Sequence, residues 1–262
     1  MATDKPKLAV HKFSSCDGCQ LALLNLGEPL LALPGLVDIV HFAEAGPNSP
    51  DQAVDISLVE GSVSTPEDIQ RIQQVRQNSK LLVSIGACAT SGGLQALGNF
   101  ANRHEWMTSV YSDPEKIEVL NSSDPISKHV KVDLQIQGCP VNSTQVIGAL
   151  RDLLSGVAPR PEVQSVCMEC KRKGLICTMV TQGEPCMGPV TLAGCGALCP
   201  AAGRGCYGCY GPAEQLNDRS ISDRFEQLGL DAQAVLRRFR FIANSAAGFK
   251  AASEGLRGDT DG

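Results

Sequence analysis

Two cysteines near the start of the chain, Cys16 and Cys19, have the spacing of a redox dithiol or of half a metal site. They follow an apolar stretch, residues 8–13, that predicts a first strand, and they precede a helix-like segment, residues 20–26. In an open α/β sheet this position is the carboxyl end of a strand, where ligands bind. The pair alone does not decide between the two chemistries.

Two further cysteines follow predicted strands in the same way. Cys88 comes after a strand expected at residues 80–85, and Cys139 comes after one expected at residues 130–136. Because parallel strands end at one edge of the sheet, we expect all four thiols to meet there. A single buried cysteine is often only a small apolar residue, but four at one edge match the ligands of a 4Fe–4S cluster. A redox dithiol would leave the two later cysteines unexplained.

Eight more cysteines lie within residues 166–211, where the chain is rich in glycine and has little apolar periodicity. A segment of this composition cannot fold around a hydrophobic core alone, so we expect metal centres to hold it together. Eight thiolates suit two four-ligand sites, and their spacing allows either zinc or iron–sulfur clusters. The total of 12 cysteines, enough for three such sites, favours iron–sulfur clusters. The eight are Cys167, Cys170, Cys177, Cys186, Cys195, Cys199, Cys206 and Cys209.

Strand-like and helix-like segments alternate over the first part of the chain and predict a mostly parallel sheet with helices on both faces. Thr65 followed by Pro66 indicates a helix start, because Thr caps a helix well and Pro suits its first position. We expect a flavodoxin-like, doubly wound α/β domain over residues 1–158 that carries the first cluster. Further strands are expected at residues 37–42 and 54–59, a helix at 142–155, and a polar insertion or lid at 99–128.

The composition changes at the Gly- and Pro-containing stretch 156–161, which predicts a domain boundary. Residues 159–262 should form a small Cys-rich domain with iron–sulfur clusters and helices. Within it, residues 223–249 are helix-like, and the polar tail 254–262 is expected to be frayed.

The composition of the 262-residue chain argues against several classes of protein. With 43% hydrophobic and 19% charged residues it is globular, and its net charge of −5 argues against nucleic acid as a partner. No apolar run approaches the roughly 20 residues that a membrane-spanning helix needs. The first residues show neither a signal peptide nor twin arginines, so we expect a cytoplasmic protein whose cysteines bind metal instead of forming disulfides.

Six short motifs, in order along residues 7–212, resemble those of the small, electron-transferring subunit of nickel–iron hydrogenases. Each motif is weak alone, and together they are specific. The chain resembles in particular the delta-type subunits of cytoplasmic sulfhydrogenases. The motifs are SCDGC from Ser15, VEGS from Val59, GACA from Gly86, GCP from Gly138, PCMGP from Pro185 and CYGC from Cys206.

The resemblance implies three 4Fe–4S clusters, each held by four cysteines. Two positions differ from the membrane-bound members: Cys167 stands where they have His, and Cys199 stands where their three-iron medial cluster has Pro. A fourth thiolate adds negative charge and should lower the potential of the medial cluster. The implied ligands are Cys16, Cys19, Cys88 and Cys139 for the proximal cluster, Cys195, Cys199, Cys206 and Cys209 for the medial one, and Cys167, Cys170, Cys177 and Cys186 for the distal one.

The resemblance further implies that this chain relays electrons and does not itself split hydrogen. Hydrogen would react at the nickel–iron centre of a separate large subunit, and a flavin or iron–sulfur subunit would link the clusters to NAD(P) or another carrier. Glu60, beside the proximal cysteines, is expected to be a helix-capping or surface acid, with a part in a proton path or in partner contact as the alternative. Two other functions stay open: a zinc-stabilised scaffold or assembly protein, and a cluster subunit of another redox complex.

Overall fold

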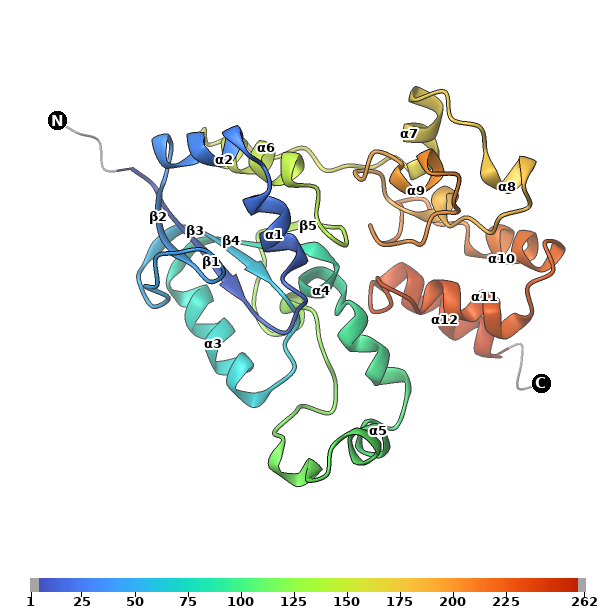
Figure 1. The fold of residues 1–262 in the computed structure, drawn as a ribbon, viewed down its shortest axis with the longest axis horizontal. Helices are drawn as coiled ribbons and strands as arrows, with labels where there is room; N and C mark the ends of the chain where they lie inside the picture. The colour runs from blue at the N-terminus through green and yellow to red at the C-terminus, as the bar shows by residue number, and fades with distance from the viewer. Residues whose placement is uncertain (1–4, 259–262) are drawn as a thin grey trace.

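The computed structural model describes residues 5–258. Its first part is built on a five-stranded parallel sheet in the order β2-β1-β3-β4-β5. This is the strand order of flavodoxins, so the predicted doubly wound α/β fold is confirmed. The strands are β1 (Lys7–Lys12), β2 (Asp38–Phe42), β3 (Val54–Glu60), β4 (Ser79–Ile85) and β5 (Leu134–Ile136), as Figure 1 shows.

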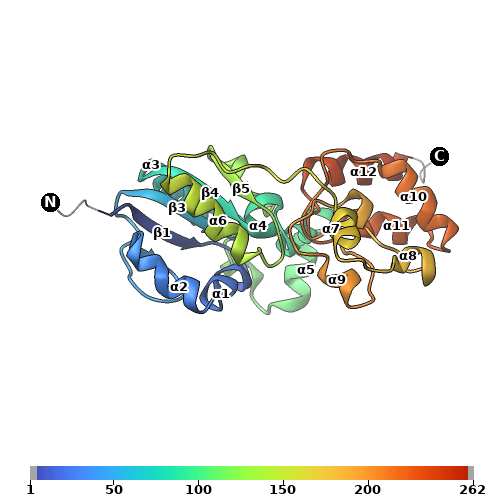
Figure 2. The same ribbon diagram turned by 90° about the horizontal axis from the view of Figure 1, so that it is seen from above.

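Helices cover both faces of the sheet (Figures 1 and 2). One face carries α1 (Gly18–Leu24), α2 (Glu28–Ala32) and α6 (Ser143–Leu154), and the other carries α3 (Pro66–Gln77). A separate cluster of buried apolar side chains lies on each face, so the sheet is covered on both sides. The start of α3 has the predicted cap, because the Thr65 hydroxyl accepts a backbone N–H from the first turn.

The last strand is shorter than the predicted 130–136. The Asp133 carboxylate accepts the backbone N–H of Leu82 in β4 at 2.9 Å. A side chain therefore takes the place of a backbone carbonyl as the partner of β4 just before β5 begins. The segment between β4 and β5 is tied to the loop after β3 by an isolated bridge between Val63 and Asp124. It contains α4 (Gly86–Ser91), α5 (Arg103–Val110) and three short 3-10 helices, Leu94–Phe100, Pro114–Lys116 and Ile126–Lys128.

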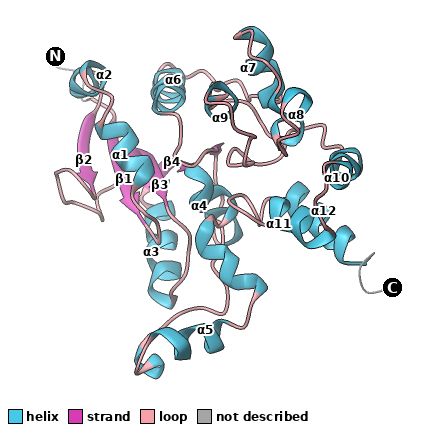
Figure 3. Cartoon of the chain, turned by 45° about the vertical axis from the view of Figure 1, so that its right-hand side comes forward, coloured by secondary structure: helices cyan, strands magenta, loops and turns pink. Residues whose placement is uncertain are grey.

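The Cys-rich segment packs against a group of C-terminal helices (Figure 3). A shared apolar cluster joins Val166 and Met187 to Phe225, Phe239 and Phe249. C-terminal helices thus supply a hydrophobic core for this segment, and the expectation that metal centres also hold it together stays a prediction. The helices are α7 (Val166–Arg172), α8 (Thr178–Thr181), α9 (Leu198–Ala201), α10 (Asp218–Gln227), α11 (Ala232–Phe239) and α12 (Ala247–Gly258), with a 3-10 turn at Gly188–Val190.

Two predictions for the C-terminal part need correction. The single helix-like segment 223–249 is part of three helices, because Gly229 turns the chain after α10 with a φ of +92°. The tail predicted as frayed from residue 254 instead continues α12 as far as Gly258. Ala252 and Ser253, in the preceding turn of α12, are buried and anchor the helix. Residues 259–262 of that prediction lie outside the described residues. No helix within 5–258 is long and apolar enough to cross a bilayer.

Candidate functional site

The four cysteines of the first predicted site lie around the carboxyl ends of three strands. Cys16 lies in the loop after β1, Cys19 at the start of α1, and Cys88 in α4, directly after β4. Cys139 follows β5. None of the cysteines is in a disulfide. The sheet topology thus places these thiols at one edge, as the sequence predicts.

Burial and neighbouring charges, other thiols among them, raise the pKa values of three cysteines in this group. The pKa of Cys88 is raised to about 12, chiefly by burial and then by Cys139 and Cys16. Burial also raises the pKa of Cys19 and of Cys139, and the Glu60 carboxylate adds to both effects. Thiolates here need a compensating positive charge, which the irons of a cluster would supply. The donor set therefore fits an iron–sulfur cluster.

Two glycines keep space free beside these sulfurs. A Cβ on Gly86 would overlap Sγ of Cys19, and the φ of Gly86 is +82°. A Cβ on Gly93 would lie 2.6 Å from Sγ of Cys88. Any larger residue at either position would displace a predicted cluster ligand.

Glu60 at the end of β3 is 2% exposed, so the expectation of a surface acid is wrong. Its Oε1 accepts the backbone N–H of Cys19 at 2.9 Å. This bond satisfies an N–H in the first turn of α1, where Asp17 makes no side-chain cap. Glu60 therefore caps α1, the helix that begins at the cysteine pair. This is the helix-capping role that was one of the expected alternatives.

A second group of cysteines adjoins the first. Cys195, Cys199, Cys206 and Cys209 line one cavity of about 370 Å³, and Cys139 lines it too. The pKa of Cys209 is raised to about 12 by burial and then by Cys195, with Cys139 among the further causes. The shared cavity connects the sheet edge with the Cys-rich segment.

A third group reaches the surface. Cys167 and Cys170 lie on α7, Cys177 immediately precedes α8, and Cys186 is buried in the loop before the 3-10 turn. The pKa of Cys167 is raised to about 11 by burial and then by Cys186, Cys170 and Cys177. Cys177 is exposed, so this group opens to solvent.

The second and third groups are in contact. The backbone N–H of Cys206 donates to Sγ of Cys186 at 3.1 Å. After burial, the charge of Cys186 is also the next cause that raises the pKa of Cys199. The division of these eight thiols between two clusters therefore stays a prediction. Within the described part of the chain, no three His, Cys, Asp or Glu side chains meet closely enough to hold a single metal ion.

Sequence reasoning missed Glu169, which lies between Cys167 and Cys170 on α7. Its carboxylate accepts backbone N–H groups of Gly194, Gly196 and Ala197 at 2.9–3.0 Å. The signal in the sequence was an acid inside a pair of predicted ligands, where it adds negative charge to a site already rich in thiolates.

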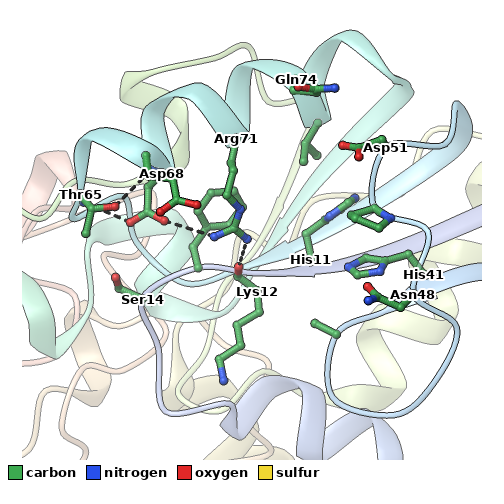
Figure 4. Close-up of a pocket in the computed structure, with 15 residues that line it drawn as sticks. His11, Lys12, Ser14, His41, Asn48, Asp51, Thr65, Asp68, Arg71 and Gln74 are labelled. Carbon is green, nitrogen blue, oxygen red and sulfur yellow. Dashed lines mark hydrogen bonds and ion pairs between the residues drawn. The ribbon is translucent and has the colours of Figure 1, made fainter.

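A separate cavity of about 730 Å³ lies on the α3 face of the sheet and contains no cysteine (Figure 4). The connection from β2 to β3 has no helix, and the cavity lies beside it. His11 and His41 line it with ring centroids 4.8 Å apart, and both are buried. Arg71 lies at its wall, where its guanidinium donates to the carbonyl of Lys12 at 2.7 Å. Both histidines are thus buried residues at the wall of this cavity.

Comparison with known proteins agrees with this geometry. Residues 16–153 match the family of the NADH ubiquinone oxidoreductase 20 kDa subunit. The sulfhydrogenase 2 subunit delta of Pyrococcus furiosus is 35% identical over 90% of this chain and 99% of its own. A subunit of the F420-non-reducing hydrogenase vhu of Methanocaldococcus jannaschii is 33% identical over 83% of this chain and 86% of its own.

A solved structure supports the same relationship. A chain of an NAD+-reducing [NiFe]-hydrogenase in the H2-reduced state superposes with a TM-score of 0.56 at 29% identity. The match covers 60% of this chain and 95% of that one. The protein therefore belongs to the family of the NADH ubiquinone oxidoreductase 20 kDa subunit and is a homologue of hydrogenase subunits.

Proposed function

We propose that the chain is the electron-transferring subunit of a heteromeric nickel–iron hydrogenase and carries three 4Fe–4S clusters. The observation that carries this proposal is the succession of three cysteine groups from the sheet edge to the surface at Cys177. Cys139 adjoins the second group, and Cys186 connects the second with the third. A bound cluster would supply reversible one-electron transfer. The residues of the chain fix the clusters in order and shield them from water.

The proposed ligands follow the three groups. The two domains proposed to hold them are residues 1–158 and 159–262, and the apolar clusters support this division because none of them crosses it. Cys16, Cys19, Cys88 and Cys139 would hold the proximal cluster, Cys195, Cys199, Cys206 and Cys209 the medial one, and Cys167, Cys170, Cys177 and Cys186 the distal one.

Two surfaces suit the proposed partners in a cytoplasmic complex. Cys16 is exposed at the sheet edge, where a nickel–iron large subunit would cover the proximal cluster. At the other end, Ile176 and Val180 flank Cys177 and are 74% and 76% exposed. Exposed large apolar residues near a proposed cluster suit a protein contact, so we assign this end to a flavin or iron–sulfur subunit that serves NAD(P) or another carrier. Lys171 and Arg172 add positive charge to this surface.

Anaerobic purification of the native complex tests the proposal. We expect about twelve irons per chain with matching sulfide, a nickel-containing partner, and reduction of the clusters by hydrogen. NAD, NADP and F420, tried as electron acceptors, would identify the carrier. A colourless protein with about two or three zinc ions would make the chain a scaffold instead. Iron without a nickel-containing partner would make it a cluster subunit of another redox complex.

A further inference from the structure

The carboxylate of Glu169 lies between the second and third cysteine groups and accepts three backbone N–H groups and the thiol of Cys195. Its Oε1 accepts the N–H groups of Gly194 and Gly196, and its Oε2 accepts that of Ala197. Among residues 5–258, no ion pair joins Glu169 to a lysine, arginine or histidine. The carboxylate is therefore a negative charge that no cation in the described chain neutralises directly.

The loop that receives this carboxylate has an unusual backbone. Gly194, Gly196 and Ala197 have φ angles of +138°, +68° and +53°. In this turn the three N–H groups converge on the carboxylate, and such converging backbone N–H groups form an anion-binding nest. Alanine rarely adopts this conformation, so the bonds to Glu169 hold the loop in place. Cys195 lies in the middle of this loop, so Glu169 positions a proposed medial ligand from within the distal pair.

The charge of Glu169 reaches both cysteine groups. Sγ of Cys195 lies 3.8 Å from Oε2. Glu169 also directly precedes Cys170 on α7, so its carboxylate belongs to the same helical turn as a proposed distal ligand. Lys173 donates to the carbonyl of Gly196 in the same loop but forms no ion pair with Glu169 within residues 5–258. One carboxylate therefore acts on a thiol of the proposed medial cluster and on a thiol of the proposed distal cluster.

We propose that Glu169 is a positioning residue that lowers the reduction potentials of the medial and distal clusters; this inference rests on the function proposed above. Two effects act in the same direction. The carboxylate opposes the added negative charge when a nearby cluster takes up an electron. It also engages three N–H groups that would otherwise be free to donate to cluster sulfurs, and such donors raise the potential.

Potentiometric titration of the complete complex, followed by electron paramagnetic resonance, tests this role in E169Q, E169D and a matched control, E162Q. The amide of E169Q removes the charge, and the shorter acid of E169D moves it away from the nest. Glu162 is a suitable control because its Oε1 also accepts two backbone N–H groups, those of Val163 and Gln164. It contributes to none of the raised cysteine pKa values in the same domain.

At a fixed ambient potential we expect the ratio of reduced to oxidised medial cluster to rise about tenfold in E169Q, or about 59 mV for a one-electron couple. E169D should shift in the same direction by less, and E162Q should match the wild type. Loaded variants with wild-type potentials would overturn the proposal. If E169Q does not incorporate iron, the test rests on E169D. A raised cluster potential in E169D supports the proposal. A wild-type potential, or loss of iron, in E169D overturns it. Wild-type complex without iron would instead refute the proposed function itself.

Discussion

The Glu60 carboxylate accepts the backbone N–H of Cys19 at 2.9 Å, and its second oxygen has no partner among the described residues. This bond joins the end of β3 to the first turn of α1, across 41 positions of sequence. Because the carboxylate is almost completely buried, it fixes the position of the cysteine pair relative to the sheet. The first proposed cluster site therefore depends on a residue that is not itself a ligand.

Replacing Glu60 by alanine should destabilise the chain. The N–H of Cys19 would remain buried without an acceptor, which costs about 1–3 kcal/mol. The conservative change E60Q keeps an acceptor and should cost less. Urea unfolding of the iron-loaded chain measures this difference, with E67A on the exposed side of α3 as the control. Equal stability of E60A and E67A would show that the bond to Cys19 contributes nothing.

The change Gly86→Ala should remove the first cluster while the rest of the chain still folds. The new Cβ would overlap Sγ of Cys19, and the φ of +82° is unfavourable for alanine. Iron analysis should show about four irons fewer per chain, with the other clusters retained. Gly148→Ala in α6 is the matched control, because nothing lies within 4 Å of its added Cβ and alanine favours a helix. Full iron content in the Gly86 variant would contradict the assigned site.

The first cysteine group could be predicted from sequence because its geometry follows from the fold class. Once alternating strands and helices indicate a parallel sheet, residues after successive strands must meet at one edge, and Cys88 and Cys139 are such residues. The family match over residues 16–153 covers this part and ends before Cys167. The remaining eight cysteines follow no strand, so their grouping depends on tertiary packing that periodicity does not encode.

The contacts of Glu169 could not be read from sequence for a similar physical reason. The N–H groups that its carboxylate accepts lie 25 to 28 residues further along the chain, and the loop that presents them is irregular. The continuation of α12 also escaped prediction, because burial of Ala252 and Ser253 outweighs the polar composition of the tail. Local composition thus predicted the regular helices and strands. Long-range contacts determined the loop bound by Glu169 and the end of α12.

Acid should destabilise the wild-type chain through His11. Burial lowers the pKa of this histidine from 6.5 to about 3, so it is neutral in the fold and takes up a proton below 6.5 when the chain unfolds. Stability must therefore fall as the pH drops through this window, by about 1 kcal/mol between about pH 7 and about pH 5.5. H11Q should lose about 1 kcal/mol of this dependence in urea unfolding and keep the share of His41, whose pKa burial also lowers, whereas H104Q, an exposed site on α5, should keep all of it. Identical pH dependence in H11Q and wild type would assign the effect to other groups.

The change Val180→Asp should slow electron transfer to the natural acceptor subunit. Val180 is 76% exposed beside the proposed distal cluster, and a charge there disfavours burial of the apolar surface in a protein contact. We expect a several-fold loss in hydrogen-dependent carrier reduction, with hydrogen–deuterium exchange by the large subunit unchanged. Val110→Asp on α5 is the control, since this residue is 72% exposed and α5 lies well apart from α7 and α8 (Figures 1 and 3). Equal carrier reduction by both variants would remove this surface as the electron exit.

Replacing Cys199 by alanine distinguishes the proposed ligand sets. This thiol lines the cavity shared with Cys195 and Cys209, yet the charge of Cys186 from the other group also acts on it. If Cys199 is the fourth medial ligand, its loss should convert that cluster to a three-iron form, with about one iron fewer per chain and a higher potential because one thiolate charge is gone. The oxidised three-iron cluster would be visible by electron paramagnetic resonance, and Cys177→Ala should produce the same change at the distal position. An unaltered iron count in Cys199→Ala would show that the medial cluster draws its fourth ligand from elsewhere.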